Sequence, residues 1–457
     1  MNVFFKRVTA SALALTLLFT TGCSSQPPAD TASGAPAVSA AVYPEMAPYP
    51  DESKYINKKT GIFDSEGFDE VYTTWRKDQQ ARFQQPEGFT NGLADFFRES
   101  IPVFLDADTA NPVCSPLNIY MALSLLAETT DGNSRQQILD AIGVKNQESL
   151  RVQAGQVWNA HYCNDGATST ILANSVWLDE GLEYSEDTIR TLTECYFASV
   201  FQGDLGSSEM NRALGNWLNE QTGGLLEEQA QNVQLDPQTV LALASTIFYQ
   251  AKWGSEFWKE QNTEGLFHTP SGDRNVTYMN KQLSYGPYYW GEDFAAASLS
   301  LEDSSQMWLI LPDEGKSPQD LLASGHALDM ILNHTTDYEN QKRIKVNLSL
   351  PKFDVVSDLQ LDSAVKQLGI TEVFDPDAAD FSGILPSSPA WLDKVQHAAR
   401  VTIDEEGVSA AAYTVMAMAG AAMPPEDEVD LVLDRPFLFV ITSRYDLPLF
   451  AGIVNEP

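Results

Sequence analysis

The chain has 457 residues, 43% of them hydrophobic and 20% charged, which is enough apolar material for a substantial core. Asp and Glu number 63 against 28 Lys and Arg, so the formal net charge is −35. This charge argues against nucleic acid or an anionic lipid surface as the partner and favours a soluble, acidic surface.

The first 22 residues predict a targeting segment. Lys6 and Arg7 precede an apolar run that is too short to span a membrane. The run ends at residues 20–23, Thr-Thr-Gly-Cys, which resemble a bacterial lipobox. The resemblance implies cleavage before Cys23 and attachment of lipid to its thiol. An ordinary secretory signal is the alternative, because Thr20 stands where Leu is usual.

The next segments differ in composition from the rest of the chain. Residues 23–42 consist largely of Pro, Ala, Ser and Thr, which cannot bury enough apolar surface to fold, so we expect a flexible tether. Residues 43–87 mix Tyr, Pro and charged residues and predict an extension of uncertain order. The main domain is expected to span residues 88–457.

Helical patterns open this domain. Apolar residues recur at helical spacing from Leu93 to Phe104. Ser115 is a good helix N-cap, and Pro116 suits the first helical position. The helix that they begin, residues 117–127, is apolar nearly all round and should be buried. Ser134 and Gln137 have capping-box spacing, which predicts a second helix from Ser134 to Gly143.

Strands dominate the second half of the domain. Residues 168–178, 240–249, 307–311 and 344–350 predict strands, with helices at residues 210–218 and 361–368. The run 240–249 is continuously apolar, so we expect it to be buried on both faces. Helices grouped early and strands grouped late indicate an α+β domain.

The stretch after Val395 is the most unusual part of the sequence. Residues 395–403 alternate apolar with polar or small side chains, as a half-buried strand does. Past Gly407, residues 408–423 carry no charge and mostly small side chains. A soluble domain seldom exposes such a segment, because it favours strand pairing and aggregation. One explanation is that the segment is a strand held in reserve for insertion.

This stretch resembles the hinge and reactive-centre loop of the serpins. Other segments resemble serpin motifs in the same order along the chain, and together they cover about residues 88–457. They are Ser115-Pro116, Thr246 to Trp253, Leu350 to Phe353, Gln367 to Ile370, Asp380 to Gly383, Phe437 to Ile441 and Pro448 to Gly452. The resemblance implies helices packed around a large central β-sheet, two smaller sheets and an exposed reactive-centre loop.

The resemblance also implies roles for individual residues. The hinge would comprise Glu405, Gly407, Val408, Ser409, Ala410, Ala411 and Ala412. The shutter and breach, where the central sheet parts, would comprise Ser115, Asn118, Ser245, His397 and Trp253. Family partners of His397 fall at Asn118 and Ser245, where this chain exchanges the usual Ser and Asn.

The composition of the loop agrees with insertion as a strand. Alternate residues from Val408 to Met418 can all be buried, while Tyr413 falls on the outer face. No proline or charge interrupts residues 408–422, so a continuous ladder is allowed. Counted from Gly407 as in the family, the cleaved bond lies between Ala421 and Ala422, within about two residues. A small residue before that bond suits elastase-like serine proteases.

Signals for catalysis and cofactors are weak. The five histidines form no metal-binding pattern, and there is no G-x-S-x-G motif and no phosphate-binding glycine loop. We expect no cofactor and no metal. Besides Cys23, the chain has Cys114, Cys163 and Cys195, so at least one thiol should be free, with buried inert cysteines favoured over a reactive thiol.

The sequence therefore predicts a monomeric inhibitor of serine proteases, and not an enzyme. Residues 408–420 would insert into the central sheet after cleavage and trap the protease as an acyl-enzyme. Lipid on Cys23 would hold the protein on the extracellular side of a bacterial envelope, or the protein would be released. A non-inhibitory serpin that acts as a surface-binding protein is one alternative, and a secreted hydrolase is another.

Overall fold

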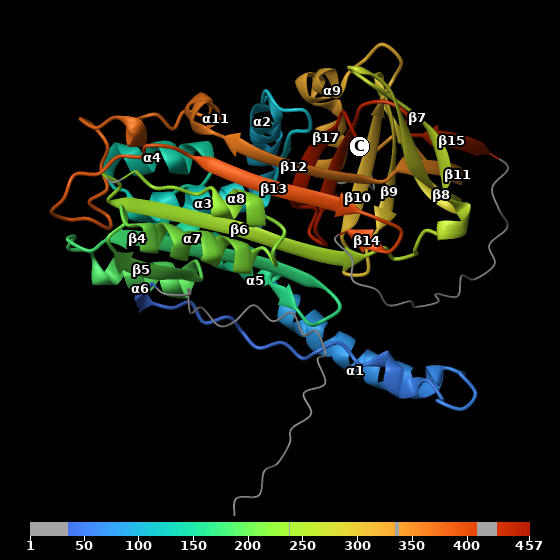
Figure 1. The fold of residues 1–457 in the computed structure, drawn as a ribbon, viewed down its shortest axis with the longest axis horizontal. Coiled ribbons are helices and arrows are strands. Elements are labelled where there is room, and N and C mark those ends of the chain that lie inside the picture. The colour runs from blue at the N-terminus through green and yellow to red at the C-terminus, as the bar shows by residue number, and fades with distance from the viewer. Residues whose placement is uncertain (1–34, 237, 334–337, 409–426) are drawn as a thin grey trace, which may run out of the picture.

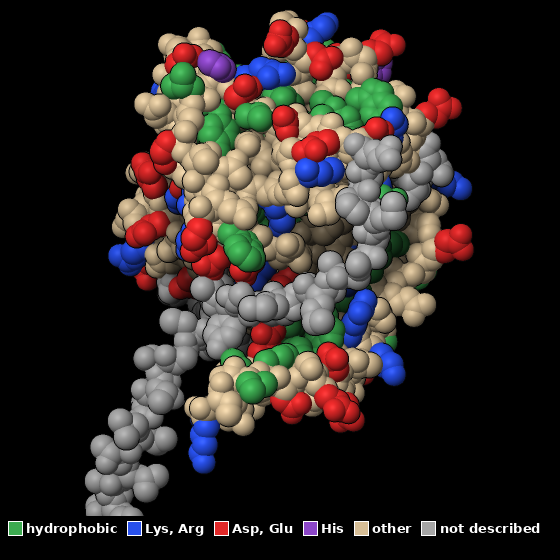
Figure 2. All heavy atoms as spheres, turned by 90° about the vertical axis from the view of Figure 1, so that its right-hand side faces the viewer, with side chains coloured by type: hydrophobic (Ala, Val, Ile, Leu, Met, Phe, Trp, Pro, Cys, Tyr) green, Lys and Arg blue, Asp and Glu red, His purple; other side chains and the backbone are tan. Residues whose placement is uncertain are grey.

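The computed structural model describes residues 35–236, 238–333, 338–408 and 427–457. Two β-sheets form the centre of the molecule, and most helices cover one of them (Figure 1). We call this sheet the large sheet, after the large central sheet that the resemblance implies. Early helices and late strands confirm the predicted α+β class. Seen from the end at the right of Figure 1, acidic side chains are spread over the surface with basic ones among them (Figure 2).

The large sheet contains eight described strands. In spatial order they are β1 (Ala37–Ser39), β5 (Ala198–Gly203), β4 (Ser169–Asp179), β6 (Leu241–Lys252), β14 (Gly407–Val408), β13 (Gln396–Ile403) and β12 (Phe353–Gln360), with β3 (Cys163–Asn164) paired to β4.

The second sheet contains nine described strands. They are β15 (Glu428–Val432), β11 (Gln341–Pro351), β8 (Gly272–Trp290), β9 (Phe294–Ser300), β10 (Gln306–Pro312), β16 (Phe437–Thr442), β17 (Pro448–Val454) and β2 (Val113–Cys114), with β7 (Thr263–Thr269) paired to β8. The 19-residue β8 pairs with β7 through its first part and with β9 at its end, which joins the two smaller sheets that we expected into one.

The described helices lie mainly in the first half of the chain. They are η1 (Glu52–Tyr55), α1 (Ser65–Phe83), α2 (Leu93–Leu105), α3 (Pro116–Thr129), α4 (Gly132–Ala141), α5 (Gln147–His161), α6 (Glu186–Cys195), α7 (Ser208–Gln221), α8 (Glu227–Gln231), η2 (Lys259–Gln261), α9 (Pro318–Ser324), α10 (His326–Leu332), α11 (Asp362–Gln367) and η4 (Glu372–Phe374).

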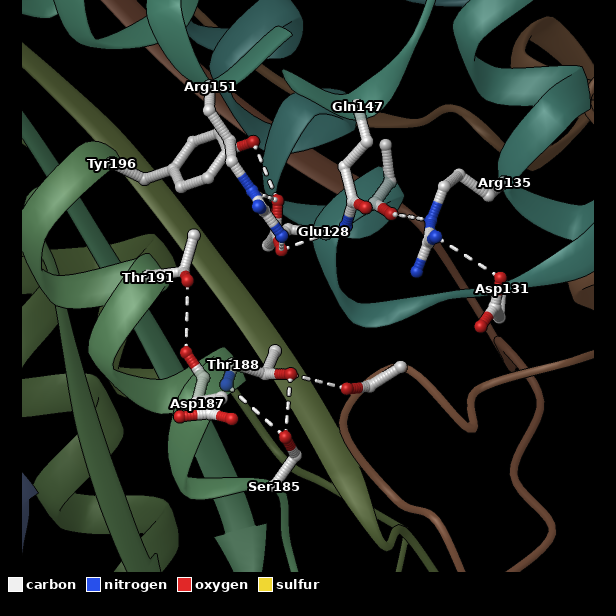
Figure 3. A network of polar contacts seen from close by, with 12 residues as sticks. Glu128, Asp131, Arg135, Gln147, Arg151, Ser185, Asp187, Thr188, Thr191 and Tyr196 are labelled. Carbon is white, nitrogen blue, oxygen red and sulfur yellow. Dashed lines mark hydrogen bonds and ion pairs between the residues drawn. The ribbon is translucent and has the colours of Figure 1, made fainter.

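Helix α3 begins as predicted and is buried along nearly its whole length. Ser115 is its N-cap, and the Ser115 hydroxyl accepts a hydrogen bond from Asn118 N. Near its end, the buried Glu128 carboxylate accepts hydrogen bonds from Arg151 and Gln147 of α5 and from the Tyr196 hydroxyl (Figure 3). A buried carboxylate needs such partners, so these bonds fix α3 against its neighbours.

The predicted start of the next helix is wrong. Helix α4 begins at Gly132 with Asp131 as its N-cap, two residues before Ser134. The Ser134 hydroxyl instead bonds Glu372 and Asp380, and the Gln137 side-chain oxygen accepts hydrogen bonds from the backbone of residues 371 and 372. Ser134 and Gln137 therefore bind the distant segment 371–380, and Asp131 caps helix α4 instead.

Part of the expected tether belongs to the fold. Residues 37–39 form β1, an edge strand that pairs with β5, so the predicted tether up to residue 42 does not hold there. Beyond it, the Tyr43 ring packs against Trp158 and Tyr162, with ring centroids 5.2 and 5.3 Å away. Long-range contacts that local sequence patterns do not reveal place this segment on the domain.

The rest of the extension is also ordered. Helix α1 runs away from the two sheets (Figure 1) and packs against the chain that precedes it. The Tyr49 ring contacts Phe68 and Trp75, and Trp75 donates a hydrogen bond to the Ala47 carbonyl. Asp64 is the N-cap of the helix.

Strand β6 differs from its predicted burial. It pairs with β4 over ten residues, but most of its side chains are only partly buried. No described strand pairs with its other edge below Ala251. The expectation of burial on both faces is therefore wrong, because this stretch of β6 borders a gap between the described strands of the sheet.

Candidate functional site

The gap in the large sheet is the centre of the candidate site. Strand β13 pairs with β12 over its eight residues, as β6 pairs with β4, yet no ladder joins β6 to β13 directly. Only β14 lies between them in the described chain, where Val408 pairs with Ala251 and with Ile403. We call the gap between Leu241–Gln250 of β6 and Gln396–Thr402 of β13 the slot.

A tight turn at residues 404–407 directs the chain from the end of β13 into the slot. The Asp404 carboxylate accepts hydrogen bonds from Glu406 N at 2.8 Å and from Gly407 N at 3.2 Å. The Asp404 amide in turn donates to the Gly407 carbonyl. These bonds reverse the chain after β13, so that β14 starts down the slot antiparallel to both of its neighbours.

Gly407 is required by the close approach of β6. A Cβ atom at this position would lie 2.7 Å from Lys252 Cα and still closer to the Ala251 carbonyl oxygen. Any larger residue would push the start of β14 away from β6. The predicted hinge glycine is therefore placed where the backbone must enter the sheet.

Glu405 anchors the turn from inside the protein. Its buried carboxylate lies 2.6 Å from Lys352 Nζ and accepts a hydrogen bond from the Asn262 side chain. Burial alone would raise the pKa of the Glu405 carboxyl, but the bonds from Lys352 and Asn262 outweigh it and lower the pKa below its ordinary value. Its carbonyl also accepts a hydrogen bond from Phe257 N.

Trp253 closes the top of β6. Its indole N–H donates to the Asp404 carbonyl at 2.8 Å, and its amide donates to the Glu406 carbonyl at 3.0 Å. The ring is buried and meets Phe257 edge to face. Trp253, which the resemblance assigns to the breach, is thus bonded to both ends of the turn formed by residues 404–407, which we call the hinge turn.

The predicted shutter residues come together halfway along the slot. The Asn118 side chain of α3 and Ser245 of β6 bond each other, and the Ser245 hydroxyl also contacts Asn174 of β4. The exchanged residues therefore still form a hydrogen-bonded pair. His397 lies outside this pair, because its Nε2 accepts a hydrogen bond from Ser115 N at 2.9 Å.

Several residues of the site were missed by sequence reasoning. Asn174 is a polar residue in the predicted strand 168–178. A polar side chain that is buried in a strand needs a partner, so this residue was a usable signal. Lys352 lies inside the family-like segment Leu350 to Phe353, but nothing local pairs it with Glu405. Asn262 had no signal in the sequence.

Other predicted residues lie outside the described part of the chain. These are Cys23, Ser409, Ala410, Ala411, Ala412, Ala421 and Ala422.

A buried Ser–His pair bears on the hydrolase alternative. His161 Nε2 lies 2.9 Å from the Ser443 hydroxyl, as in a nucleophile–base pair. However, His161 Nδ1 bonds the Val157 carbonyl instead of a carboxylate, and both side chains are buried. The adjoining cavity of about 20 Å³ holds little more than one water. A substrate cannot reach this pair.

The described cysteines are free thiols. Cys114 and Cys163 are buried, and Cys195 is partly exposed. Burial raises the pKa of all three thiols, which disfavours the reactive thiolate. Within the same described ranges, no group of His, Cys, Asp and Glu is arranged to hold a metal, and no helix is long and apolar enough to cross a membrane.

Comparison with known proteins agrees with this geometry. Residues 96–457 match the family model described as serpin (serine protease inhibitor). The chain is 28% identical to alpha-1-antiproteinase of Callosciurus caniceps over 77% of this chain and 84% of that protein. It is 26% identical to the human leukocyte elastase inhibitor over 79% of this chain and 98% of that protein.

Solved structures show the same fold. The native state of the thermophilic serpin tengpin matches with a TM-score of 0.72 and 25% identity, covering 82% of this chain and 95% of that one. Thyroxine-binding globulin in complex with thyroxine matches with a TM-score of 0.67 and 19% identity, covering 83% and 99%. The second likeness concerns the fold alone.

Two buried histidines predict how stability depends on pH. Burial lowers the pKa of His161 and of His397 to about 4. Between an unfolded pKa near 6.5 and a folded pKa near 4, the unfolded chain binds protons that the native chain does not. Stability should therefore be complete above about pH 6.5 and fall as the pH drops towards 4, by at most about 3 kcal/mol per histidine.

Thermal melting between pH 7.5 and 4.5 tests this expectation. His397→Gln should lose part of the pH dependence. His268→Gln should not reduce it, because the hydrogen bond to Asp273 raises the pKa of this exposed histidine, which opposes the fall in stability. Equal slopes for His397→Gln and the parent would contradict it.

Proposed function

Because the chain belongs to the serpin family, we propose that it inhibits serine proteases as a suicide substrate. The observation that supports this most directly is the slot, with a hinge bonded at its mouth and a charge-free segment following Val408. Relatives named as antiproteinase and elastase inhibitor agree with the proposal. Insertion of a strand into an existing sheet is a known way to couple cleavage to a large movement.

The strand register supports the length of the insertion. If the pairing of Gly407 with Lys252 continued without a bulge, residue 418 would reach Leu241, the first residue of β6. The same register would place Thr414 between Ser245 and His397 of the shutter. Residues 409–418 thus have the length that the slot requires.

The target we propose is an elastase-like serine protease, which would cleave the inhibitor between Ala421 and Ala422. A small residue before the bond fits a shallow apolar primary pocket. The alternative, a serpin that binds without inhibiting, would be favoured by proline or charge in the hinge. Residues 407–418 contain neither.

We further propose that lipid on Cys23 holds the inhibitor on the extracellular face of a bacterial envelope. The basic start of the leader, its short apolar run and the cysteine at its end support this location.

Incubation with pancreatic or neutrophil elastase tests the inhibitory proposal. We expect an SDS-stable complex, release of a fragment that starts at Ala422, and a higher melting temperature of the cleaved inhibitor, because insertion completes the sheet. Cleavage without a complex and without thermal stabilisation would reject it. Mass spectrometry of the fragment would identify the cleaved bond.

Two neighbouring substitutions test the insertion register. Residue 410 would lie between the buried Tyr249 and Val401, so Ala410→Glu should force a carboxylate into the core. We expect roughly tenfold or more inhibitor to be consumed per protease trapped. Residue 409 would lie between the partly exposed Gln250 and Thr402, so Ser409→Glu is the matched control and should inhibit almost as the parent does. Similar behaviour of the two variants would contradict the register.

Detergent partitioning tests the anchor. The parent protein, produced in a bacterial host, should enter the detergent phase and carry a lipid on Cys23. Cys23→Ser should move to the aqueous phase, whereas Cys195→Ser should partition as the parent does. Recovery of the parent in the aqueous phase, with an intact thiol at Cys23, would exclude the anchor.

A further inference from the structure

The connection between α7 and α8 crosses the slot. Residues 222–226, which we call the bridging turn, lie between these helices on one face of the large sheet (Figure 1). One end of the turn contacts β6 and the other is bonded to β13. A strand that entered the slot would have to pass beneath it.

The contact with β6 depends on a glycine. Gly223 has a φ of +60°, and a Cβ atom there would lie 2.8 Å from the Phe248 ring. The backbone of the turn therefore lies directly on that ring. Nearby, the buried Gln221 and Thr246 each leave a side-chain oxygen without a hydrogen-bond partner among the described residues. The surface between α7 and β6 is thus packed closely, but its polar groups are not all satisfied.

The contact with β13 is made by Arg400. Its Nη1 donates to the Leu225 carbonyl at 3.2 Å. Its Nε and Nη2 donate to the Asp354 carboxylate of β12 at 2.8 and 2.6 Å. The bond from Arg400 lowers the pKa of the Asp354 carboxyl, so the pair stays ionised. The two-pronged contact with Asp354 orients the guanidinium and leaves its third nitrogen for the turn.

The strand register places the two contacts opposite each other. Val408 pairs with Ala251 on one side and Ile403 on the other. Phe248 and Arg400 each lie three residues further down their strands, and both point towards the bridging turn. The turn therefore spans the slot at the third position beyond Val408, the last described residue of β14.

We propose that Arg400 is a positioning residue that latches the bridging turn across the slot and thereby limits the rate of strand insertion. This inference rests on the proposed function, since it concerns entry of the loop strand. While the latch is closed, Val408 can stay paired with Ala251 and Ile403. Residue 411 and the residues after it cannot enter the slot until the bridging turn moves.

Annealing of a synthetic peptide tests the latch without a protease. The probe is a peptide with the sequence of residues 409–418, mixed with the full-length protein, and its uptake is followed by the shift in urea-gradient gels. Arg400→Ala should take up the peptide about tenfold faster than the parent, because a charged hydrogen bond across the slot is lost. Gln396→Ala is the matched control. It removes a side-chain contact with Asp358 between the same two strands, away from the turn, and should anneal at the parental rate.

A conservative variant separates the latch from general loss of stability. Arg400→Lys keeps a positive charge beside Asp354 but lacks the planar fork, so it should anneal as fast as Arg400→Ala. Amide exchange of residues 222–226 should rise in both variants and not in Gln396→Ala. Parental annealing rates in both Arg400 variants, or a parental rate restored by lysine, would overturn the latch.

The same assay distinguishes failure of the latch from failure of the proposed function. If the peptide anneals to neither the parent nor the variants, the slot does not accept a strand, and both ideas fall. If annealing is equal in all proteins and elastase still forms a complex, inhibition stands and the latch falls.

Discussion

The arrangement depends on two strands, β6 and β13, that share a sheet without pairing with each other in the described chain. Hydrogen bonds hold β6 to β4 and β13 to β12, while β14 joins the two halves through two residues only. Strand edges that face a gap offer unpaired N–H and C=O groups, which readily accept another strand. A ten-residue strand added there would gain on the order of 10 kcal/mol from its ladders, even at the modest net value of each bond. Insertion of the loop strand, as we propose it, would therefore reach a more stable arrangement, and the hinge turn directs the chain towards the slot.

The residues around the mouth of the slot fix how the chain enters it. Asp404 bonds the amides of its own turn, Glu405 is held by Lys352 and Asn262, and Trp253 bonds two carbonyls of the same turn. These contacts fix the direction of entry and require no part of the segment beyond Val408. Further down, the shutter pair of Asn118 and Ser245 ties α3 to β6, and the Ser115 amide at the start of α3 donates a hydrogen bond to His397 of β13. Helix α3 is therefore bonded to both halves of the sheet.

How much of this was predictable depends on the range of each interaction. The alternation of residues 395–403 and the Ser115-Pro116 start of α3 are local patterns, and both are confirmed. The start of α4 was missed because Asp131, not Ser134, caps it, and Ser134 has a partner more than two hundred residues away. Burial of β6 could not be read from its composition, since it depends on whether another strand lies beside it. The order of the extension rests on ring contacts such as Tyr43 with Trp158, which no local period encodes.

The short strand β1 has a mechanical consequence. Any tension applied from the amino-terminal side enters the fold where Ala37 and Ser39 pair with β5, and these two pairs are few enough to peel apart one after the other. The next resistance comes from the Tyr43 ring, which packs against both Trp158 and Tyr162 and must be pulled off the two rings together. A load on this end is therefore absorbed at the rim of the large sheet, three strands away from β14, before it can disturb the hinge.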